Sequence, residues 1–175
     1  MVLLFTDEVS FYRQPSQASL FFVRGRRQPR LRYSHRSNTC MRVAGFLDAV
    51  SGRVFARDAS HLSAAWLGRR WKEVAQAYPD AKRIYLVMDN WPVHYHPKAL
   101  AAVEEDPRLK PLYLPTYAPW LNPIEKLWRL VKQTTTHTHP WCDDFTTFKD
   151  QVRETLANPT PRPSALLRYV GLLSA

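Results

Sequence analysis

The fold is limited most by one short run, residues 84–88, in which apolar residues follow one another without a polar break and an Asp-Asn pair comes directly after. A strand that alternates apolar and polar residues can leave one face in water, whereas an unbroken apolar strand has to be covered on both faces. The run therefore predicts the centre of a sheet with helices on both sides. The chain has 45% hydrophobic and 13% aromatic residues, which is enough to form such a core.

The segments around this strand follow a recognisable order. Before it come β-like runs at 2–6, 42–50 and 53–57, the last two joined by Ser51-Gly52, which suits a tight hairpin, and a helix-like segment at 61–78. After it come a helix at 96–105, a strand at 112–114, a helix at 122–134 and a helix at 145–156. This is the order of an RNase H-like α/β fold, with a mixed five-stranded sheet of three antiparallel and then two parallel strands, flanked by helices. We expect 1–157 to form this domain, with a basic insertion at about 13–41, and 158–175 to form a Pro-rich linker and a short C-terminal tail.

Positive charge is concentrated in the insertion. The formal net charge is +10, and no acidic residue occurs from 13 to 47. Such an excess on a small domain favours a polyanionic partner, with nucleic acid as the first candidate. We interpret the arginines as phosphate contacts, which position DNA without reading its sequence, while a solvated loop without a partner is the alternative. The residues concerned are Arg24, Arg26, Arg27, Arg30, Arg32 and Arg36.

The cysteines and the apolar runs bear on where the chain works. Cys40 and Cys142 are too few for the disulfide framework of a small secreted domain, so a reducing cytoplasm is expected. No apolar run approaches the roughly 20 residues that span a bilayer, so no membrane segment is expected. The group His137, His139 and Cys142 lacks a second pair of ligands at matching spacing, so no zinc site is expected.

Three acidic residues stand where the expected sheet could bring them together. Asp7 follows the run 2–6, Asp89 follows the run 84–88, and Glu125 lies in the first turn of the helix at 122–134. Neighbouring carboxylates repel one another, and a divalent cation removes that penalty. Hard oxygen ligands suit Mg²⁺ or Mn²⁺. Two such ions about 4 Å apart can act on a phosphodiester by activating the attacking oxygen and stabilising the leaving oxygen.

Each acid also has a structural interpretation. Asp89 could serve only in the turn after its strand, and Glu125 could belong to a capping box that starts at Asn122. Asp7 is harder to explain without a partner, because a carboxylate in a central strand is costly to bury. Glu8 should point to the opposite face of the strand, so it is left out of the expected site.

Three segments of this sequence resemble a known family. They are FTDE at 5–8, VMDNWPVH at 87–94 and LPTYAPWLNPIEKLW at 114–128. Together they resemble the DDE endonuclease domain of bacterial insertion-sequence transposases related to mariner. The resemblance implies that Asp7, Asp89 and Glu125 are the catalytic, metal-binding triad, holding two Mg²⁺ or Mn²⁺ ions. It implies further that Asn90 and His94 support the ligands, although a purely structural role for His94 is the alternative.

The resemblance also implies an activity and partners. The activity is DNA strand cleavage and strand transfer, and the partners are double-stranded DNA, at the element ends and at the target, and a second copy of the transposase in a homodimer. Family members carry an N-terminal DNA-recognition region, which we expect to be missing here or to lie on another chain. The place of action implied is the bacterial cytoplasm, at the nucleoid. The alternatives are a non-catalytic DNA-binding remnant and a stand-alone RNase H-like nuclease. The role of His137, which resembles a family histidine, stays open.

Overall fold

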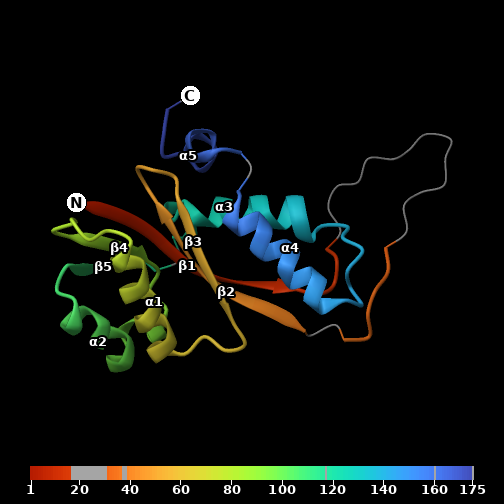
Figure 1. The fold of residues 1–175 in the computed structure, drawn as a ribbon, viewed down its shortest axis with the longest axis horizontal. Coiled ribbons are helices and arrows are strands. Elements are labelled where there is room, and N and C mark those ends of the chain that lie inside the picture. The colour runs from red at the N-terminus through yellow and green to blue at the C-terminus, as the bar shows by residue number, and fades with distance from the viewer. Residues whose placement is uncertain (17–30, 37–38, 117, 160, 175) are drawn as a thin grey trace.

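The computed structural model describes residues 1–16, 31–36, 39–116, 118–159 and 161–174. A five-stranded sheet forms its centre (Figure 1), with the strand order β3-β2-β1-β4-β5. The strands are β1 (Val2–Tyr12), β2 (Cys40–Asp48), β3 (Val54–Ala59), β4 (Ile84–Met88) and β5 (Leu109–Tyr113).

The pairing of the strands confirms the expected mixed sheet. β1 runs antiparallel to β2, and β2 runs antiparallel to β3 across the hairpin that contains Gly52. The φ angle of Gly52 is +69°, a conformation that glycine adopts without strain. β1 runs parallel to β4, and β4 runs parallel to β5. The fold is therefore RNase H-like, and β1 and β4 are neighbours, as the order of elements predicts.

Helices cover both faces of the sheet (Figure 1). They are α1 (Ala64–Gln76), α2 (Pro97–Glu105), α3 (Ile124–Val131), α4 (Phe145–Ala157) and α5 (Pro163–Val170), with short 3₁₀ turns η1 (Pro92–Tyr95) and η2 (Pro119–Leu121) and a π-helical turn η3 (Lys132–Thr136). Among the described residues, none of these helices has the length and apolar character that crossing a membrane requires.

Alternation along β1 divides the core into two layers. Leu4 packs with Trp71 of α1 and Leu86 of β4 on one face, while Val9 packs with Trp128 of α3 on the other. Because successive side chains of a strand point to opposite faces, Asp7 shares the face of Val9 and Glu8 shares the face of Leu4. The strand thus presents its two neighbouring acids to different layers of helices.

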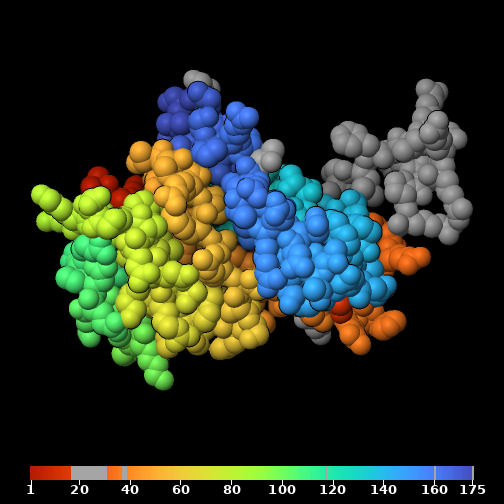
Figure 2. All heavy atoms as spheres, in the orientation of Figure 1, coloured from red at the N-terminus to blue at the C-terminus, as the bar shows by residue number. Residues whose placement is uncertain are grey.

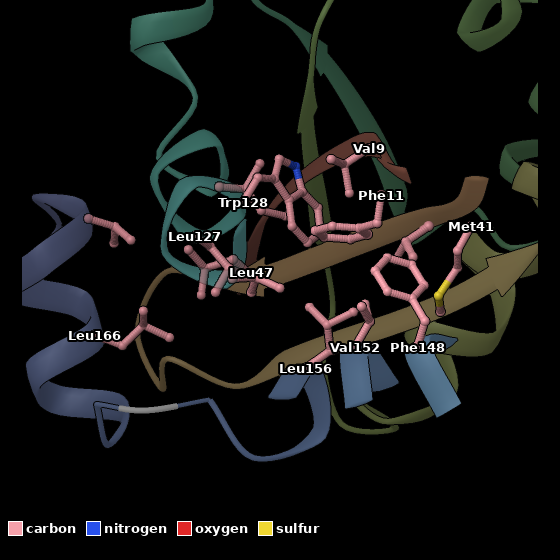
Figure 3. Close-up of a cluster of buried hydrophobic side chains, with 14 residues drawn as sticks. Val9, Phe11, Met41, Leu47, Leu127, Trp128, Phe148, Val152, Leu156 and Leu166 are labelled. Atoms are coloured by element: carbon pink, nitrogen blue, oxygen red, sulfur yellow. The ribbon is translucent and has the colours of Figure 1, made fainter. Parts of the chain in front are cut away.

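The α3 layer is tightly packed (Figure 3). Trp128, 2% exposed, lies in a cluster with Phe11, Leu127 and Phe148. Its ring occupies the space above Gly45 in β2, where an added Cβ atom would lie 2.2 Å from Trp128 Cη2. Glycine at 45 is therefore what allows helix α3 to lie directly on the sheet.

Helix α4 is attached to the edge of the sheet by an ion pair. Arg153 donates two hydrogen bonds to Asp58 of β3, with N–O distances of 3.0 and 2.8 Å. In the space-filling view the C-terminal helices, in blue, lie against the orange β2 and β3 segment (Figure 2).

Several elements differ from the sequence-based expectation, and β5, expected at 112–114, spans Leu109–Tyr113. β1 continues through Asp7 and Glu8 to Tyr12 instead of ending at Thr6, because β2 supplies paired residues as far as Cys40. The helix expected at 122–134 is α3 followed by the π-helical turn η3, in which the Thr134 and Thr136 hydroxyls donate to backbone carbonyls one turn back. The segment expected as linker and tail contains α5, whose Leu166 and Val170 pack into the core.

Candidate active site

Asp7 lies in the middle of the long strand β1 and faces helix α3. Its Oδ2 atom accepts a hydrogen bond of 2.8 Å from the indole nitrogen of Trp128. Burial, followed by repulsion from the Glu8 and Glu125 carboxylates, raises the pKa of Asp7 to about 8. The metal-free site therefore favours a proton on Asp7 at neutral pH, and a cation bound nearby would offset the shift by stabilising the charged carboxylate.

Asp89 follows β4 at the point where pairing between β1 and β4 has just ended. The last paired residues are Phe5 and Val87, so Asp7 and Asp89 both lie beyond the ladder. The side chain of Asp89 is 57% exposed, and its Oδ1 atom accepts a hydrogen bond of 3.0 Å from the backbone nitrogen of Trp91. Asp89 therefore does stabilise the turn after its strand, and this contact occupies one of its two carboxylate oxygens.

Glu125 is exposed in the first turn of α3, and the capping-box interpretation is not what the structure shows. The start of α3 has no side-chain capping hydrogen bond. Asn122 is buried instead, and its amide nitrogen donates a bond of 3.1 Å to the carbonyl of Thr6. This contact, which sequence reasoning missed, holds the start of α3 against β1 directly beside Asp7.

The three acids line one hollow beyond the end of the pairing between β1 and β4. Its volume is about 310 Å³, and Asn90, Trp91 and Asn122 line it together with Asp7, Asp89 and Glu125. A second hollow of about 430 Å³ shares Asp7, Asp89 and Trp91 and adds Glu8 and Arg42. The structure therefore brings the three predicted acids to one hollow, and two of them also line the second.

The carboxylates of the three acids suit a hard divalent cation in their chemistry. Their side chains do not form a complete set of metal ligands. Carboxylate oxygens are the ligands that Mg²⁺ and Mn²⁺ prefer. Within the described parts of the chain, no three His, Cys, Asp or Glu residues are gathered closely enough to hold a metal ion. The hydrogen bonds of Asp7 to Trp128 and of Asp89 to Trp91 direct one oxygen of each group to the protein.

Glu8 faces away from Asp7, as alternation predicts, yet it belongs to the surroundings of the site. Its Oε2 atom lies 3.2 Å from Nε2 of His94, a ring that is 1% exposed. Burial lowers the pKa of His94, but the Glu8 hydrogen bond and charge, with help from Asp89, outweigh it and leave the pKa above its usual value.

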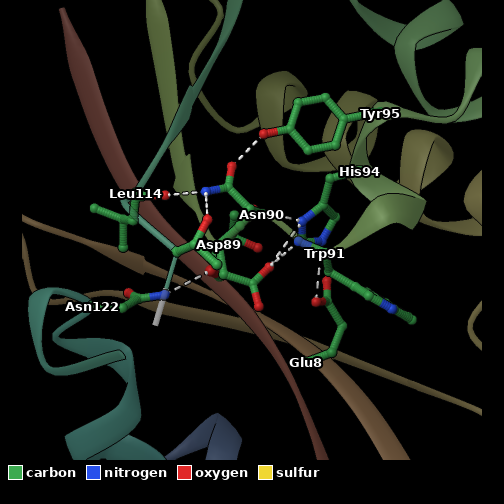
Figure 4. Close-up of polar contacts among 10 residues, drawn as sticks. Glu8, Asp89, Asn90, Trp91, His94, Tyr95, Leu114 and Asn122 are labelled. Carbon is green, nitrogen blue, oxygen red and sulfur yellow. Dashed lines mark hydrogen bonds and ion pairs between the residues drawn. The ribbon is translucent and has the colours of Figure 1, made fainter. Parts of the chain in front are cut away.

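Asn90 connects the loops that follow β4 and β5 (Figure 4). Its amide nitrogen donates to the carbonyl of Leu114 at 2.5 Å and to the hydroxyl of Thr116 at 3.2 Å. The hydroxyl of Tyr95 donates to its amide oxygen. Asn90 thus fixes the loop that carries Asp89.

The predicted DNA-binding arginines are only partly described. Arg32 and Arg36 are exposed after β1, whereas Arg24, Arg26, Arg27 and Arg30 lie outside the described residues.

The model of the DDE superfamily endonucleases matches residues 2–149 of this chain, which is most of its length and includes all three acids. The chain belongs to this family. A relative in Shigella sonnei, described as an insertion element IS630 uncharacterized 39 kDa protein, is 27% identical over 161 residues, which are 92% of this chain and 46% of that protein. The chain therefore spans about half the length of this relative.

Solved structures agree with the RNase H-like DDE fold. The pre-cleavage Mos1 transpososome matches with a TM-score of 0.73 at 15% identity, over 96% of this chain and 51% of that chain. The Mos1 mariner paired-end complex with Mn matches with a TM-score of 0.70 at 15% identity, over 96% of this chain and 51% of that chain. The Mos1 transposase catalytic domain with raltegravir and Mn matches with a TM-score of 0.65 at 15% identity, over 96% of this chain and 75% of that chain.

Proposed function

We propose that this chain is the catalytic domain of a DDE transposase, which cleaves DNA strands at element ends and joins them to a target. The observation that carries the proposal is that Asp7, Asp89 and Glu125, from three separate elements, line one hollow. Family membership and the likeness to transposase complexes that hold a transposon end support it.

Asp7, Asp89 and Glu125 are the residues that would hold the metal. Mn and Mg occur in complexes of the Mos1 transposase, which supports a divalent ion here. When bound, two such ions would supply an activated attacking oxygen and a stabilised leaving oxygen. If the hydrogen bond from Trp128 opened, Oδ2 of Asp7 would also be available for this role.

Further residues would orient the acids and bind the DNA. Asn122 holds the start of α3, and hence Glu125, against β1. Asn90 holds the loop of Asp89. Arg32 and Arg36, together with Arg24, Arg26, Arg27 and Arg30, would contact DNA phosphates, consistent with the net charge of +10. We further propose that two copies of the transposase act together on the DNA ends at the nucleoid.

The proposal is tested by Mg²⁺-dependent nicking of duplex DNA by the wild type and by Asp89→Asn. Asparagine keeps an oxygen that accepts from the Trp91 amide, so the turn should survive while the negative charge is lost. We expect nicking to fall at least about 100-fold with DNA binding retained, because metal ligation accounts for several kcal/mol of transition-state stabilisation. Asp80→Asn, which removes an exposed charge far from the hollow, is the matched control.

The outcomes separate the proposed enzyme from a DNA-binding remnant. Equal nicking by the wild type and Asp89→Asn would show that the assigned site is wrong. If the wild type binds DNA but does not nick it, with or without Mg²⁺, the chain is a non-catalytic DNA-binding remnant. Preference for a branched junction over element ends would identify a stand-alone nuclease.

A further inference from the structure

His94 is held between two acids that come from different elements (Figure 4). Its Nε2 atom lies 3.2 Å from Glu8 Oε2, and its Nδ1 atom lies 3.2 Å from both the carbonyl oxygen and Oδ1 of Asp89. Carboxylates and carbonyls only accept hydrogen bonds. Both ring nitrogens therefore satisfy their contacts as donors, and the imidazole links Glu8 to Asp89.

The surroundings fix this ring in place. Trp91 meets it edge-on with ring centroids 5.6 Å apart, and Trp71 of α1 lies at 6.3 Å. The turn η1, which begins at Pro92, carries His94 back under the loop of Asp89. A buried and closely packed imidazole has few alternative rotamers, so it can transmit the position of one carboxylate to the other.

The link lies where the backbone no longer holds the two strands together. Hydrogen-bonded pairing of β1 with β4 ends at Phe5 and Val87, two residues before Asp7 and Asp89. Beyond that point, side chains of the described residues connect β1 to the loop of Asp89, from Glu8 to His94 to Asp89. Glu8 is only 10% exposed, and its Oε1 atom is buried without a hydrogen-bond partner among the described residues. Stability alone explains such a pair poorly, because desolvation offsets much of the attraction in buried ion pairs.

We propose that His94 and Glu8 are positioning residues, which set the distance and rotamer of the Asp89 carboxylate relative to Asp7. The inference rests on the proposed metal site and extends it to Glu8, whose side chain points away from Asp7. His94 engages Oδ1 of Asp89, and Trp91 engages the same atom. Oδ2 therefore stays free of hydrogen bonds among the described residues and available as a ligand.

The test is Mn²⁺ affinity in the absence of DNA, measured from the electron paramagnetic resonance signal of free Mn²⁺. Glu8→Ala and His94→Ala should each weaken Mn²⁺ binding about 10–100-fold, the usual effect of removing a residue that orients a metal ligand. The double variant should be no weaker than the worse single variant, because both changes break one chain of contacts. Glu8→Gln keeps an oxygen that accepts from His94 and should bind Mn²⁺ nearly as the wild type does.

His139→Ala is the matched control for loss of a buried histidine. His139 is 3% exposed and stacks on Trp141 at 5.6 Å, with no part in either hollow. It should lower the melting temperature and leave Mn²⁺ affinity unchanged. Such a result would exclude general destabilisation as the cause in His94→Ala.

Two results would overturn the inference, and they can be told apart. Wild-type affinity in both Glu8→Ala and His94→Ala, with binding lost in Asp89→Asn, would remove the positioning role and leave the metal site standing. Mn²⁺ binding that Asp89→Asn does not affect would overturn the metal site itself, and the positioning role with it.

Discussion

At the scale of single residues, Asp7 is a side chain whose proposed function requires a charge that destabilises the folded protein. Its carboxyl group has a pKa of about 8, raised first by burial and then by the neighbouring acids Glu8 and Glu125. The carboxyl group of Asp7 is costly to ionise in the folded protein, yet it lines a hollow with two other acids. This placement indicates that Asp7 serves to bind a ligand and not to stabilise the fold. Without a cation, the folded chain should become less stable as the pH rises from the ordinary pKa of an aspartate towards the raised pKa of folded Asp7.

The sign of this effect gives a prediction for Asp7→Asn. Between pH 4 and pH 8 the folded protein holds a proton on Asp7 that the unfolded chain releases, so the free energy of unfolding should fall as the pH rises through this window. Asparagine removes the ionisation and keeps an acceptor for Trp128. At pH 7 the metal-free variant should be more stable by up to about 4 kcal/mol, since each pKa unit corresponds to about 1.4 kcal/mol.

Urea unfolding at pH 4 and at pH 7 measures this difference in the presence of a chelator. The gain of Asp7→Asn should nearly vanish at pH 4, and Asp80→Asn should show no gain at either pH. A variant that is no more stable than the wild type at pH 7 would mean that Asp7 is not strained in the folded protein.

At the scale of elements, the site depends on how closely α3 lies on the sheet. The ring of Trp128 fills the space above Gly45 and donates to Asp7, so one side chain sets both the packing of the helix and the rotamer of an acid. The helix that carries Glu125 is therefore positioned by contacts on β1 and β2.

Gly45→Ala should disturb this arrangement. The new methyl group would lie within 2.2 Å of Trp128 Cη2, so the indole ring or the helix must move. We expect a loss of about 1–3 kcal/mol, the usual cost of overpacking a core. Trp128→Phe makes room, so in a double-mutant cycle the two changes together should cost less than the sum of the single changes. Strict additivity in chemical unfolding would contradict the contact.

Helix α5 belongs to the core through Leu166. Leu166 of α5 is fully buried in the α3 layer, whereas Leu173 is 45% exposed. Leu166→Ala should lower the free energy of unfolding by about 2–5 kcal/mol, and Leu173→Ala should change it by less than about 0.5 kcal/mol. Equal effects would mean that α5 does not belong to the core.

The elements also show how far sequence reasoning reaches. The unbroken apolar run predicted β4 with its observed bounds, and the pattern at 145–156 predicted α4 to within one residue, because both signals are local. The end of β1 was predicted wrongly, since a charged pair looks like a strand end unless the pairing with β2 is known. The contacts Asn122–Thr6 and Glu8–His94 join residues 116 and 86 positions apart, so no local sequence pattern predicts them.

At the scale of the whole molecule, the charge distribution should govern DNA binding. The site itself is acidic, while the net charge is +10, so the attraction for DNA has to come from basic residues outside the hollow. Each phosphate contact contributes about 0.9 to the slope of log affinity against log salt concentration.

Replacing Arg32 and Arg36 together by alanine should therefore lower this slope by up to about 2, in fluorescence anisotropy with a labelled duplex. The matched control is Lys82→Ala with Arg83→Ala, which removes the same charge in front of β4, at the other end of the strand from Asp89. If both double variants change the slope equally, the effect is one of net charge, and no contact is made after β1.

We propose that the side chains at 7, 89 and 125 share a divalent metal site. Anomalous X-ray scattering from crystals soaked in Mn²⁺ can locate the ions. Two manganese peaks are expected in the hollow, contacted by Asp7, Asp89 and Glu125. Manganese bound elsewhere, with these three carboxylates left on protein hydrogen bonds alone, would contradict the proposal.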